Sequence, residues 1–373
     1  MRYFKDVADS EISNKKVIVR ADLNVPMQGK VVTDTYRIRR STKSILHLRE
    51  KGAKTIVLAH IGRDPKESLE FVAEELRKYV PLSFVRDITG SDAHTAISAM
   101  RAGDVLLLEN VRRIPGETDN DQTFVRSMAG YGEFYVNDAF SAAHRAHASI
   151  VGLAQALPHC GGYLLQEEVE NLSLALSPRA PSLAILGGAK FETKEPLIKK
   201  LLDAYDHVFL AGALVNDALK AKGYEVGRSL ISDGAPDAQV LSNPKLLLPV
   251  DVLVERSDGQ ARVRQVHEVT TDEKIVDIGP ESFALLLPFI RDARTILWNG
   301  PTGWYEGGYD DWTHALAQAI AESKAQSVVG GGDTVAAIGK SGLDQQFTFL
   351  STAGGAMLEF LLNGTLPGLQ ALE

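Results

Sequence analysis

The feature that most constrains the fold of this chain is a repeated alternation of short β-branched runs with longer amphipathic segments. Such alternation is typical of parallel sheets whose strands are connected by helices. Strands are expected at 17–20, 55–60, 104–108 and 134–136 in a first set, and at 182–186, 207–210, 248–254, 295–298, 327–329 and 347–350 in a second. The pattern therefore predicts an α/β protein with two lobes.

Residues 164–176, rich in Leu, Gln and Glu, are expected to form a helix that connects the two lobes. The length supports this division, because 373 residues with 45% hydrophobic content exceed what one core usually holds. A strand pair is also predicted within 248–267, with Ser257-Asp258-Gly259 as its turn.

Composition excludes several classes of protein. A formal net charge of −8, with Lys and Arg scattered along the chain, argues against a nucleic-acid partner. The single Cys160 excludes an intramolecular disulfide. No apolar run approaches the roughly 20 residues that span a bilayer, and the charged start lacks a signal peptide's apolar stretch. We therefore expect a cytoplasmic protein without a membrane partner.

Basic residues recur just past the apparent strands of the first lobe. The run at 17–26 ends in a cation, a carboxylate and an amide, and further basic residues follow at Arg37, His60, Arg63, Arg112, His144, Arg145 and His147. Polar groups at the carboxyl ends of parallel strands converge on one rim, and guanidinium groups bind phosphate or carboxylate bidentately. Any one of these residues alone would be an ordinary surface charge. The set predicts an anion clamp, whereas the pair His144 and His147 lacks the further ligands of a zinc site.

The second lobe places glycines where the first places arginines. Glycine-rich turns follow four of its expected strands, at 187–190, 299–303, 330–334 and 351–355. Such turns let backbone N–H groups approach phosphate oxygens, so four of them favour a polyphosphate pocket over tight packing. Lys190 and Lys194, four residues apart at the start of an expected helix, would point to the same place. Asp333 could hold Mg²⁺ there, or cap a helix, or do both.

Two familiar nucleotide motifs are excluded. Gly339-Lys340-Ser341 ends like a P-loop, but Thr334 stands where the first glycine is required. Gly330 and Gly332 are followed by Val335 where the third glycine of a dinucleotide fingerprint belongs. The pocket must be of another kind.

The chain resembles the phosphoglycerate kinase family from about Val17 to Gly368. The resemblance rests on Val-Arg-Ala-Asp-Leu-Asn-Val-Pro (19–26), Leu-Glu-Asn-Val-Arg (108–112), Asn-Asp-Ala-Phe-Ser-Ala-Ala-His-Arg-Ala-His (137–147), Leu-Ala-Ile-Leu-Gly-Gly-Ala-Lys (183–190), Trp-Asn-Gly-Pro (298–301), Gly-Gly-Gly-Asp-Thr (330–334) and Leu-Pro-Gly (366–368). It implies two doubly wound parallel-sheet lobes, in a monomer that transfers a phosphoryl group between 1,3-bisphosphoglycerate with ADP and 3-phosphoglycerate with ATP in glycolysis.

The resemblance also implies a domain plan. Residues 1–163, with a tail at about 357–373, would bind 3-phosphoglycerate; 164–176 would be the hinge; and 177–356 would bind ATP or ADP with Mg²⁺. The implied phosphoglycerate ligands are Asp22, Leu23, Asn24, Arg37, His60, Ile61, Gly62, Arg63, Arg112 and Arg145. The implied nucleotide ligands are Lys194, Gly212, Asn299, Glu306, Gly331, Gly332, Asp333 and Thr334, with Glu306 on the ribose and Asp333 on the metal.

The implied chemistry needs no general base, because a carboxylate or a phosphate is already an ionised nucleophile. Arg37 and Lys194 are expected to stabilise the transferring phosphoryl group, with Lys190 and the backbone N–H groups of Gly354 and Gly355 assisting. Closure of the two lobes would bring the substrates into line.

Several positions depart from the family's usual residues. Ala211 and Ala213 replace glycines near the adenine, Ala353 replaces the first glycine of Ser-Thr-Gly-Gly-Gly, Asp64 replaces a proline after Arg63, and Trp312 replaces a glycine. If position 353 required a positive φ, Ala353 would be strained by about 1 kcal/mol or more. Two alternatives therefore remain: a binding module that has lost catalysis, and an unrelated α/β kinase acting on another acyl phosphate.

Overall fold

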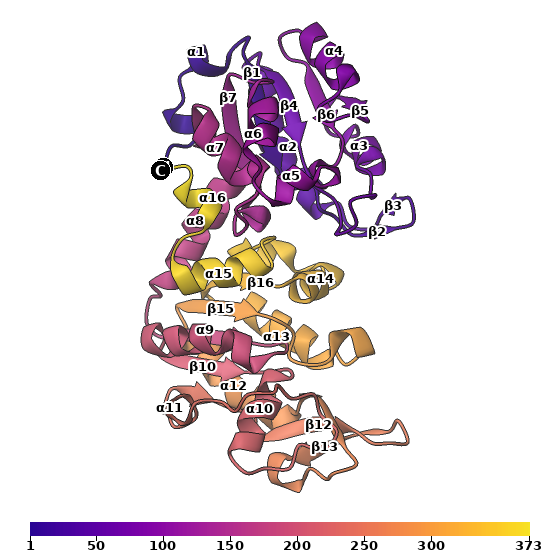
Figure 1. Cartoon of the computed structure of the whole chain (residues 1–373). Helices are drawn as coiled ribbons and strands as arrows, with labels where there is room; N and C mark the ends of the chain where they lie inside the picture. Colours follow the sequence, from indigo (N-terminus) through magenta and orange to yellow (C-terminus); the bar gives the residue numbers. More distant parts are fainter. The chain divides into compact units, whose positions relative to one another are not determined.

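In the computed structural model, which describes residues 1–373, the strands predicted in the first set lie in one parallel sheet, and all but one of those predicted in the second set lie in another. The chain forms two units: unit 1 comprises residues 1–170 and 365–373, and unit 2 comprises residues 171–364. Each unit contains one six-stranded sheet, and Figure 1 shows the strands flanked by helices. The predicted α/β class with two parallel-sheet lobes is confirmed.

The sheet of unit 1 has the order β5-β6-β4-β1-β7-β8. Its strands are β1 (Lys16–Ala21), β4 (Lys54–Leu58), β5 (Ser83–Val85), β6 (Val105–Leu108), β7 (Phe134–Asp138) and β8 (His159–Gly161), all in parallel pairs. Residues 17–21 of β1 are all buried, because both faces of the central strand are covered. The order reverses beside β1, and ligands of doubly wound sheets bind at such a switch point.

Helices and short connections complete unit 1. They are α1 (Asp9–Ile12), α2 (Tyr36–Glu50), α3 (Glu70–Leu76), α4 (Ser91–Ala99), α5 (Pro115–Thr118), α6 (Gln122–Ala129), α7 (Leu153–Ala156) and α16 (Pro367–Gln370), the single turns η1 (Phe4–Asp6), η2 (Val111–Arg113), η3 (Phe140–Ala142) and η4 (Ala148–Gly152), and the hairpin β2 (Met27–Gln28) with β3 (Val31–Val32).

The main sheet of unit 2 has the order β11-β10-β9-β15-β16-β17, with its switch point beside β9. Its strands are β9 (Ser182–Leu186), β10 (His207–Leu210), β11 (Leu246–Leu247), β15 (Thr295–Asn299), β16 (Gln326–Gly330) and β17 (Phe349–Leu350). The helices are α9 (Phe191–Ala204), α10 (Leu214–Ala221), α11 (Ala238–Leu241), α12 (Pro280–Asp292), α13 (Asp311–Glu322), α14 (Gly332–Lys340) and α15 (Gly355–Asn363), with the turns η5 (Val266–Glu268), η6 (Tyr305–Gly307) and η7 (Asp344–Gln346).

A second, antiparallel sheet in unit 2 contains β12 (Asp251–Glu255), β13 (Ala261–Gln265) and β14 (Lys274–Ile278), in the order β13-β12-β14. The predicted hairpin with its turn at 257–259 is confirmed by the β12–β13 pairing. The strand expected at 248–254 therefore belongs to this sheet and not to the main one. Residues 274–278 were not predicted as a strand.

The helix expected at 164–176 is present as α8 (Tyr163–Leu176), and the division between the units falls within it. Asp138, at the end of β7, caps the start of α8: its Oδ1 accepts hydrogen bonds from the backbone N–H groups of Leu164 and Leu165, at 2.8 and 3.2 Å.

The C-terminal tail joins unit 1 from Thr365, and not from about residue 357 as expected. Helix α15 instead belongs to unit 2, where Lys200 of α9 donates to the carbonyl of Leu362 at 2.9 Å. Within the tail, the Gly368 N–H donates to the Ala143 carbonyl at 2.8 Å. Figure 1 shows α16 as the yellow end of the chain.

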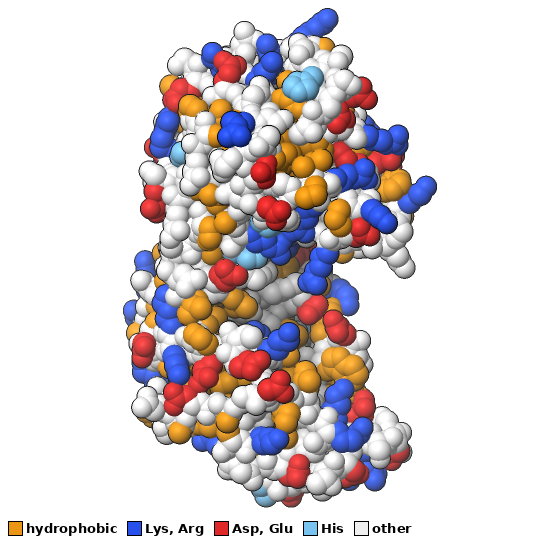
Figure 2. All heavy atoms as spheres, in the orientation of Figure 1, with side chains coloured by type: hydrophobic (Ala, Val, Ile, Leu, Met, Phe, Trp, Pro, Cys, Tyr) orange, Lys and Arg blue, Asp and Glu red, His pale blue; other side chains and the backbone are white.

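No helix combines the length and the apolar character needed to cross a lipid bilayer. On the face drawn in Figure 2, acidic and basic side chains are interspersed over most of the surface.

Candidate functional site

A cluster of cations forms at the carboxyl ends of the strands of unit 1. His60 follows β4, Arg112 lies in η2 after β6, and Arg145 follows η3. Burial lowers the pKa of His60 well below its usual value, and the nearby charges of Arg20, Arg112, Arg145 and His147 lower it further. These groups are therefore close enough to repel one another.

The same repulsion acts on the guanidinium groups. Burial lowers the pKa of Arg112 to about 10, with Arg145, Arg20 and Arg63 adding to the effect. A concentration of positive charge with few counterions is the electrostatic signature of an anion site.

Arg37 is held by the segment that follows β1. Its Nη1 lies 3.3 Å from Asp22 Oδ1 and 3.2 Å from the Asn24 carbonyl. Asn24 Oδ1 in turn accepts from the Gly62 N–H at 2.9 Å. Asp22 is buried, and its Oδ2 has no partner in the protein.

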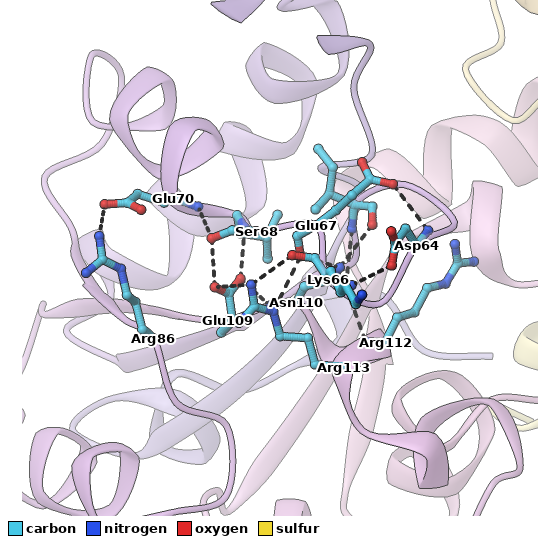
Figure 3. A network of polar contacts seen from close by, with 12 residues as sticks. Asp64, Lys66, Glu67, Ser68, Glu70, Arg86, Glu109, Asn110, Arg112 and Arg113 are labelled. Atoms are coloured by element: carbon cyan, nitrogen blue, oxygen red, sulfur yellow. Dashed lines mark hydrogen bonds and ion pairs between the residues drawn. The ribbon is translucent and has the colours of Figure 1, made fainter. Parts of the chain in front are cut away.

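The loop that carries Arg63 is fixed by residues from the end of β6 (Figure 3). Glu109 accepts from the Ser68 hydroxyl at 2.7 Å and from the Leu69 N–H at 2.8 Å. The Asn110 side chain donates to the carbonyls of Ile61 and Glu67, both at 3.0 Å. Sequence reasoning did not assign these supporting roles, although both residues lie in the Leu-Glu-Asn-Val-Arg motif at 108–112.

Two predicted ligands of unit 1 are core residues. The side chains of Leu23 and Ile61 pack in a hydrophobic cluster with exposed fractions of 0% and 2%. Only their backbone atoms are available to a ligand, so these side chains are not part of the site.

Unit 2 contains a cavity of about 610 Å³ at the carboxyl ends of its main sheet. Three predicted residues line it: Gly212, Glu306 and Asp333. Its size and mixed lining are typical of a small-molecule site.

Lys194 lies beside this cavity. Its Nζ donates to the Gly187 carbonyl at 2.9 Å and lies over Gly188, which lines the cavity. Burial lowers the pKa of Lys194. Lys190 is exposed and precedes α9 in a left-handed conformation, with φ of +65°. The prediction that the two lysines share a helical face is therefore wrong.

The alanine substitutions fall where an alanine fits. Gly212 keeps the one position of the 211–213 turn with a positive φ, +59°, and a Cβ there would lie 2.6 Å from the Gly188 backbone nitrogen. Ala213 has φ of −68°, and Ala211 packs in the core. In the turn at 351–355, the residue with a positive φ, +56°, is Gly354 and not Ala353. The strain expected at Ala353 is therefore absent.

The remaining predicted residues divide by exposure. A Cβ at Gly332, Gly354 or Gly355 would meet nothing within 4 Å, so these backbones are open to a ligand. Gly331 has φ of +103° and precedes α14. The side chains of Asn299 and Thr334 are buried, with the Asn299 amide 3.7 Å from Met357 Sδ, so they do not line the cavity.

A sequence model of the phosphoglycerate kinase family matches residues 7–364. The chain belongs to this family. It is 42% identical, over 395 aligned positions, to the phosphoglycerate kinase of Zymomonas mobilis subsp. mobilis, covering 100% of this chain and 99% of that protein. The protein of Rubrobacter xylanophilus is 43% identical over 384 positions, covering 99% of this chain and 98% of that protein.

Solved phosphoglycerate kinase structures have the same fold. The structure from Coxiella burnetii superimposes with a TM-score of 0.84 at 38% identity, covering 99% of this chain and 98% of that one. The structure from Pyrococcus horikoshii gives a TM-score of 0.89 at 30% identity, covering 100% and 98%. The chain is thus a phosphotransferase of glycolysis, whose reaction is a phosphoglycerate kinase's Mg²⁺-dependent phosphoryl transfer.

The predicted metal ligand, Asp333, lies at the cavity of unit 2. No group of three or more His, Cys, Asp or Glu side chains could cage a metal ion. Asp333 is an exposed single carboxylate beside the cavity. Because Mg²⁺ is usually held by one or two carboxylates together with substrate phosphates and water, Asp333 fits an ion that arrives with the nucleotide.

Further residues, which were not predicted from the sequence, line the cavity of this phosphoglycerate kinase family member. They include Arg228, Lys274, Asp277 and Trp304. Lys274 Nζ lies 3.3 Å from the centroid of the Trp304 ring, a cation–π contact. Lys274 and Asp277 come from β14, whose absence from the predicted elements hid them. Trp312 instead packs against the core, where its ring lies 5.1 Å from that of Phe283.

Proposed function

We propose that unit 1 binds 3-phosphoglycerate or 1,3-bisphosphoglycerate and that unit 2 binds ATP or ADP, as the two half-sites of reversible phosphoryl transfer. In terms of domains, 1–163 with the tail would hold phosphoglycerate and 177–356 the nucleotide. The family membership supports the reaction, and the contents of each unit support the division of substrates between them.

The observation that carries the proposal is the concentration of cations in unit 1, which Glu117 balances only in part. The pKa of Arg112, lowered to about 10 by burial and neighbouring arginines, indicates a cost of holding the cations together. An anionic substrate removes this cost, so His60, Arg63, Arg112 and Arg145 would bind its phosphate or carboxylate. The buried, unpartnered Asp22 Oδ2 would accept a hydrogen bond from the substrate's hydroxyl.

In unit 2, the cavity would hold the nucleoside with Glu306 on the ribose, and the open glycine backbones would face the phosphates. Asp333 would hold Mg²⁺, which when bound neutralises charge on the phosphate oxygens. Gly331 at the start of α14 would bring backbone N–H groups to the same oxygens.

The proposed mechanism is alignment with charge stabilisation. Arg37, fixed by Asp22 and Asn24, and Lys194, fixed by the Gly187 carbonyl, would bind the equatorial oxygens of the phosphoryl group in transfer. Lys190 and the N–H groups of Gly354 and Gly355 would add donors. No proton is removed, since the attacking oxygen is already ionised.

Helix α8 would be the hinge, because its residues belong to both units. Transfer requires the two substrates in line and protected from water, and hinge closure is the usual means. We further propose that the enzyme acts as a cytoplasmic monomer, as the resemblance implies.

Arg145→Ala tests the assignment of unit 1. The Arg145 side chain is exposed and makes no hydrogen bond or ion pair within the protein, so its truncation should leave the fold intact. Calorimetric titration should show roughly 10- to 100-fold weaker binding of 3-phosphoglycerate, since a hydrogen bond to a charged group contributes about 1.5–3 kcal/mol. Binding of ADP should be unchanged.

The matched control is Arg39→Ala, which removes an exposed arginine of α2 outside the cluster. Equal losses in the two variants would contradict a specific role for Arg145. Unchanged binding of 3-phosphoglycerate by Arg145→Ala would contradict it as well.

A further inference from the structure

A buried chain of hydrogen bonds lies behind the cation cluster and ends on His60. Arg20, a β1 residue with 1% exposure, places Nη2 2.9 Å from His60 Nδ1. A guanidinium group only donates hydrogen bonds. His60 Nδ1 must therefore accept, which leaves it without a proton.

The position of Arg20 is itself fixed. Its Nε donates to Ser149 Oγ at 2.8 Å, and its Nη1 donates to the Ala21 carbonyl at 2.8 Å. The Ser149 hydroxyl donates to Glu117 Oε1 at 2.6 Å, and the Ser149 N–H donates to Glu117 Oε2 at 2.9 Å. Each hydrogen bond has a defined direction. Ser149 Oγ accepts from Arg20, so its only O–H must donate to Glu117.

Both Glu117 and Ser149 are buried, at 0% and 1% exposure. A buried carboxylate is costly unless it is hydrogen-bonded and paired. Glu117 accepts two bonds from Ser149, and its charge lies near that of Arg20. The Ser149 hydroxyl group thus connects the buried Arg20 cation to its counterion, Glu117.

We propose that Ser149 and Glu117 are positioning residues that hold Arg20 against His60 and so fix its imidazole as the neutral tautomer with the proton on Nε2. This proposal rests on the proposed function in one respect: the Nε2–H would be a hydrogen-bond donor to an anionic oxygen of phosphoglycerate. The tautomer itself is a property of the protein without substrate.

The groups that act most strongly on His60 favour the neutral ring. Burial is the main cause of its lowered pKa, and the charged or titratable neighbours that act on it, Arg20, Arg112, Arg145 and His147, act in the same direction. His60 is 3% exposed, and its Nε2 is not one of the fully buried polar atoms that lack a partner. A ligand can therefore reach this nitrogen. A neutral Nε2–H donor would keep its proton across the range of about pH 5 to 8 in which a free histidine titrates.

Nitrogen NMR of the histidine rings in the substrate-free protein tests the proposal directly. The two-bond correlations between ring nitrogens and ring protons distinguish the Nε2–H tautomer, the Nδ1–H tautomer and the imidazolium. The His60 signals are assigned by their loss in His60→Gln. We expect the Nε2–H pattern without change from about pH 5 to about pH 8. An Nδ1–H pattern, or an imidazolium within that range, would overturn the proposal.

Ser149→Ala tests the positioning role. It removes the hydroxyl between Arg20 and Glu117, so we expect a mixture of tautomers at His60. In kinetic assays the KM for 3-phosphoglycerate should rise roughly tenfold, the effect of one hydrogen bond to a charged group, while the KM for ATP stays the same. Glu117→Gln, which keeps a polar acceptor, should shift the tautomer in the same direction by less.

The matched control is Tyr135→Phe. The buried Tyr135 hydroxyl donates to the Ser149 carbonyl at 2.7 Å. This variant therefore loses a hydrogen bond to the same residue but keeps the side-chain hydrogen bonds that connect Arg20, Ser149 and Glu117. It should change neither the tautomer nor the KM. A tautomer that shifts equally in Tyr135→Phe, or stays fixed in Ser149→Ala, would contradict the positioning role.

The two proposals fail differently. A wild-type protein with the Nε2–H pattern but without turnover would support the tautomer assignment and overturn the proposed function. A wild-type protein with turnover but with the Nδ1–H pattern would do the reverse.

Discussion

Among single residues, Asp277 has an unusual environment in the cavity of unit 2. The residue is 3% exposed, and its Oδ2 has no partner in the protein. Its Oδ1 accepts from the Ile278 N–H at 2.8 Å. Burial raises the pKa of Asp277 to about 7, which is the reverse of the usual effect of folding on a carboxylate. The protonated form is therefore favoured in the folded state.

Asp277→Asn should change the pH dependence of stability. Because the folded pKa of about 7 lies above the unfolded value of about 3.9, the stabilising contribution is complete below about pH 4 and lost as the pH rises through about 7. The variant keeps a neutral side chain throughout. Its free energy of unfolding, relative to wild type, should rise by up to about 1.4 kcal/mol per pH unit across that window, as measured by urea denaturation.

The control is Asp203→Asn, which alters an exposed carboxylate of α9 in the same unit and should show no such trend. A difference between Asp277→Asn and wild type that is flat from pH 4 to pH 8 would contradict the buried protonated carboxyl.

At the scale of elements, the turn between β10 and α10 decides the shape of the cavity. Gly212 approaches the Gly188 backbone where no Cβ fits, whereas its neighbour Ala213 adopts a helical conformation. Alanine therefore fits at positions 211 and 213 of this turn and does not fit at 212.

Gly212→Ala should destabilise unit 2 by about 2 kcal/mol or more, because it combines a positive φ with a backbone clash. It should also weaken ADP binding. Ala213→Gly should cost only about 0.4–1 kcal/mol, through the entropy of the unfolded chain, with ADP affinity retained. Thermal unfolding with and without ADP would separate the two effects. Equal behaviour of the two variants would contradict this account of the turn.

Most long buried strands were predicted from the sequence, although the five-residue β14 was not. Of the short edge strands of the two main sheets, only β17 was predicted. The bounds of β9 and β10 agree with the prediction, because each is a run of apolar residues that are buried in the sheet. The edge strands β8 and β11 have three and two residues and lack β-branched runs. Their pairing depends on the neighbouring strand.

The candidate site shows the same limit. Charged groups and glycine turns at strand ends can be recognised in the sequence. Leu23 and Ile61 were predicted as ligands from the family resemblance, and their side chains pack in the core. A role for their backbone atoms stays a prediction. Trp304 and Lys274 meet only because a separate sheet folds over the cavity, and no local pattern contains that contact.

For the whole molecule, the central claim is a division of labour. Unit 1 carries a cation cluster, and unit 2 carries a cavity of nucleoside size with glycine turns. Neither alone contains both Arg37 and Lys194, the two charges assigned to the phosphoryl group. Catalysis should therefore depend on one residue from each unit.

The most direct measurement is phosphoryl transfer from ATP to 3-phosphoglycerate with Mg²⁺, in which hydroxylamine traps the acyl phosphate, on wild type, Arg37→Ala, Lys194→Ala and the control Arg39→Ala. We predict turnover by wild type and Arg39→Ala, and a loss of at least about 100-fold in kcat for each of the other two, as for removal of one donor to a developing charge. Absent turnover by a wild-type protein that binds both substrates, or full activity in either Arg37→Ala or Lys194→Ala, would contradict the account.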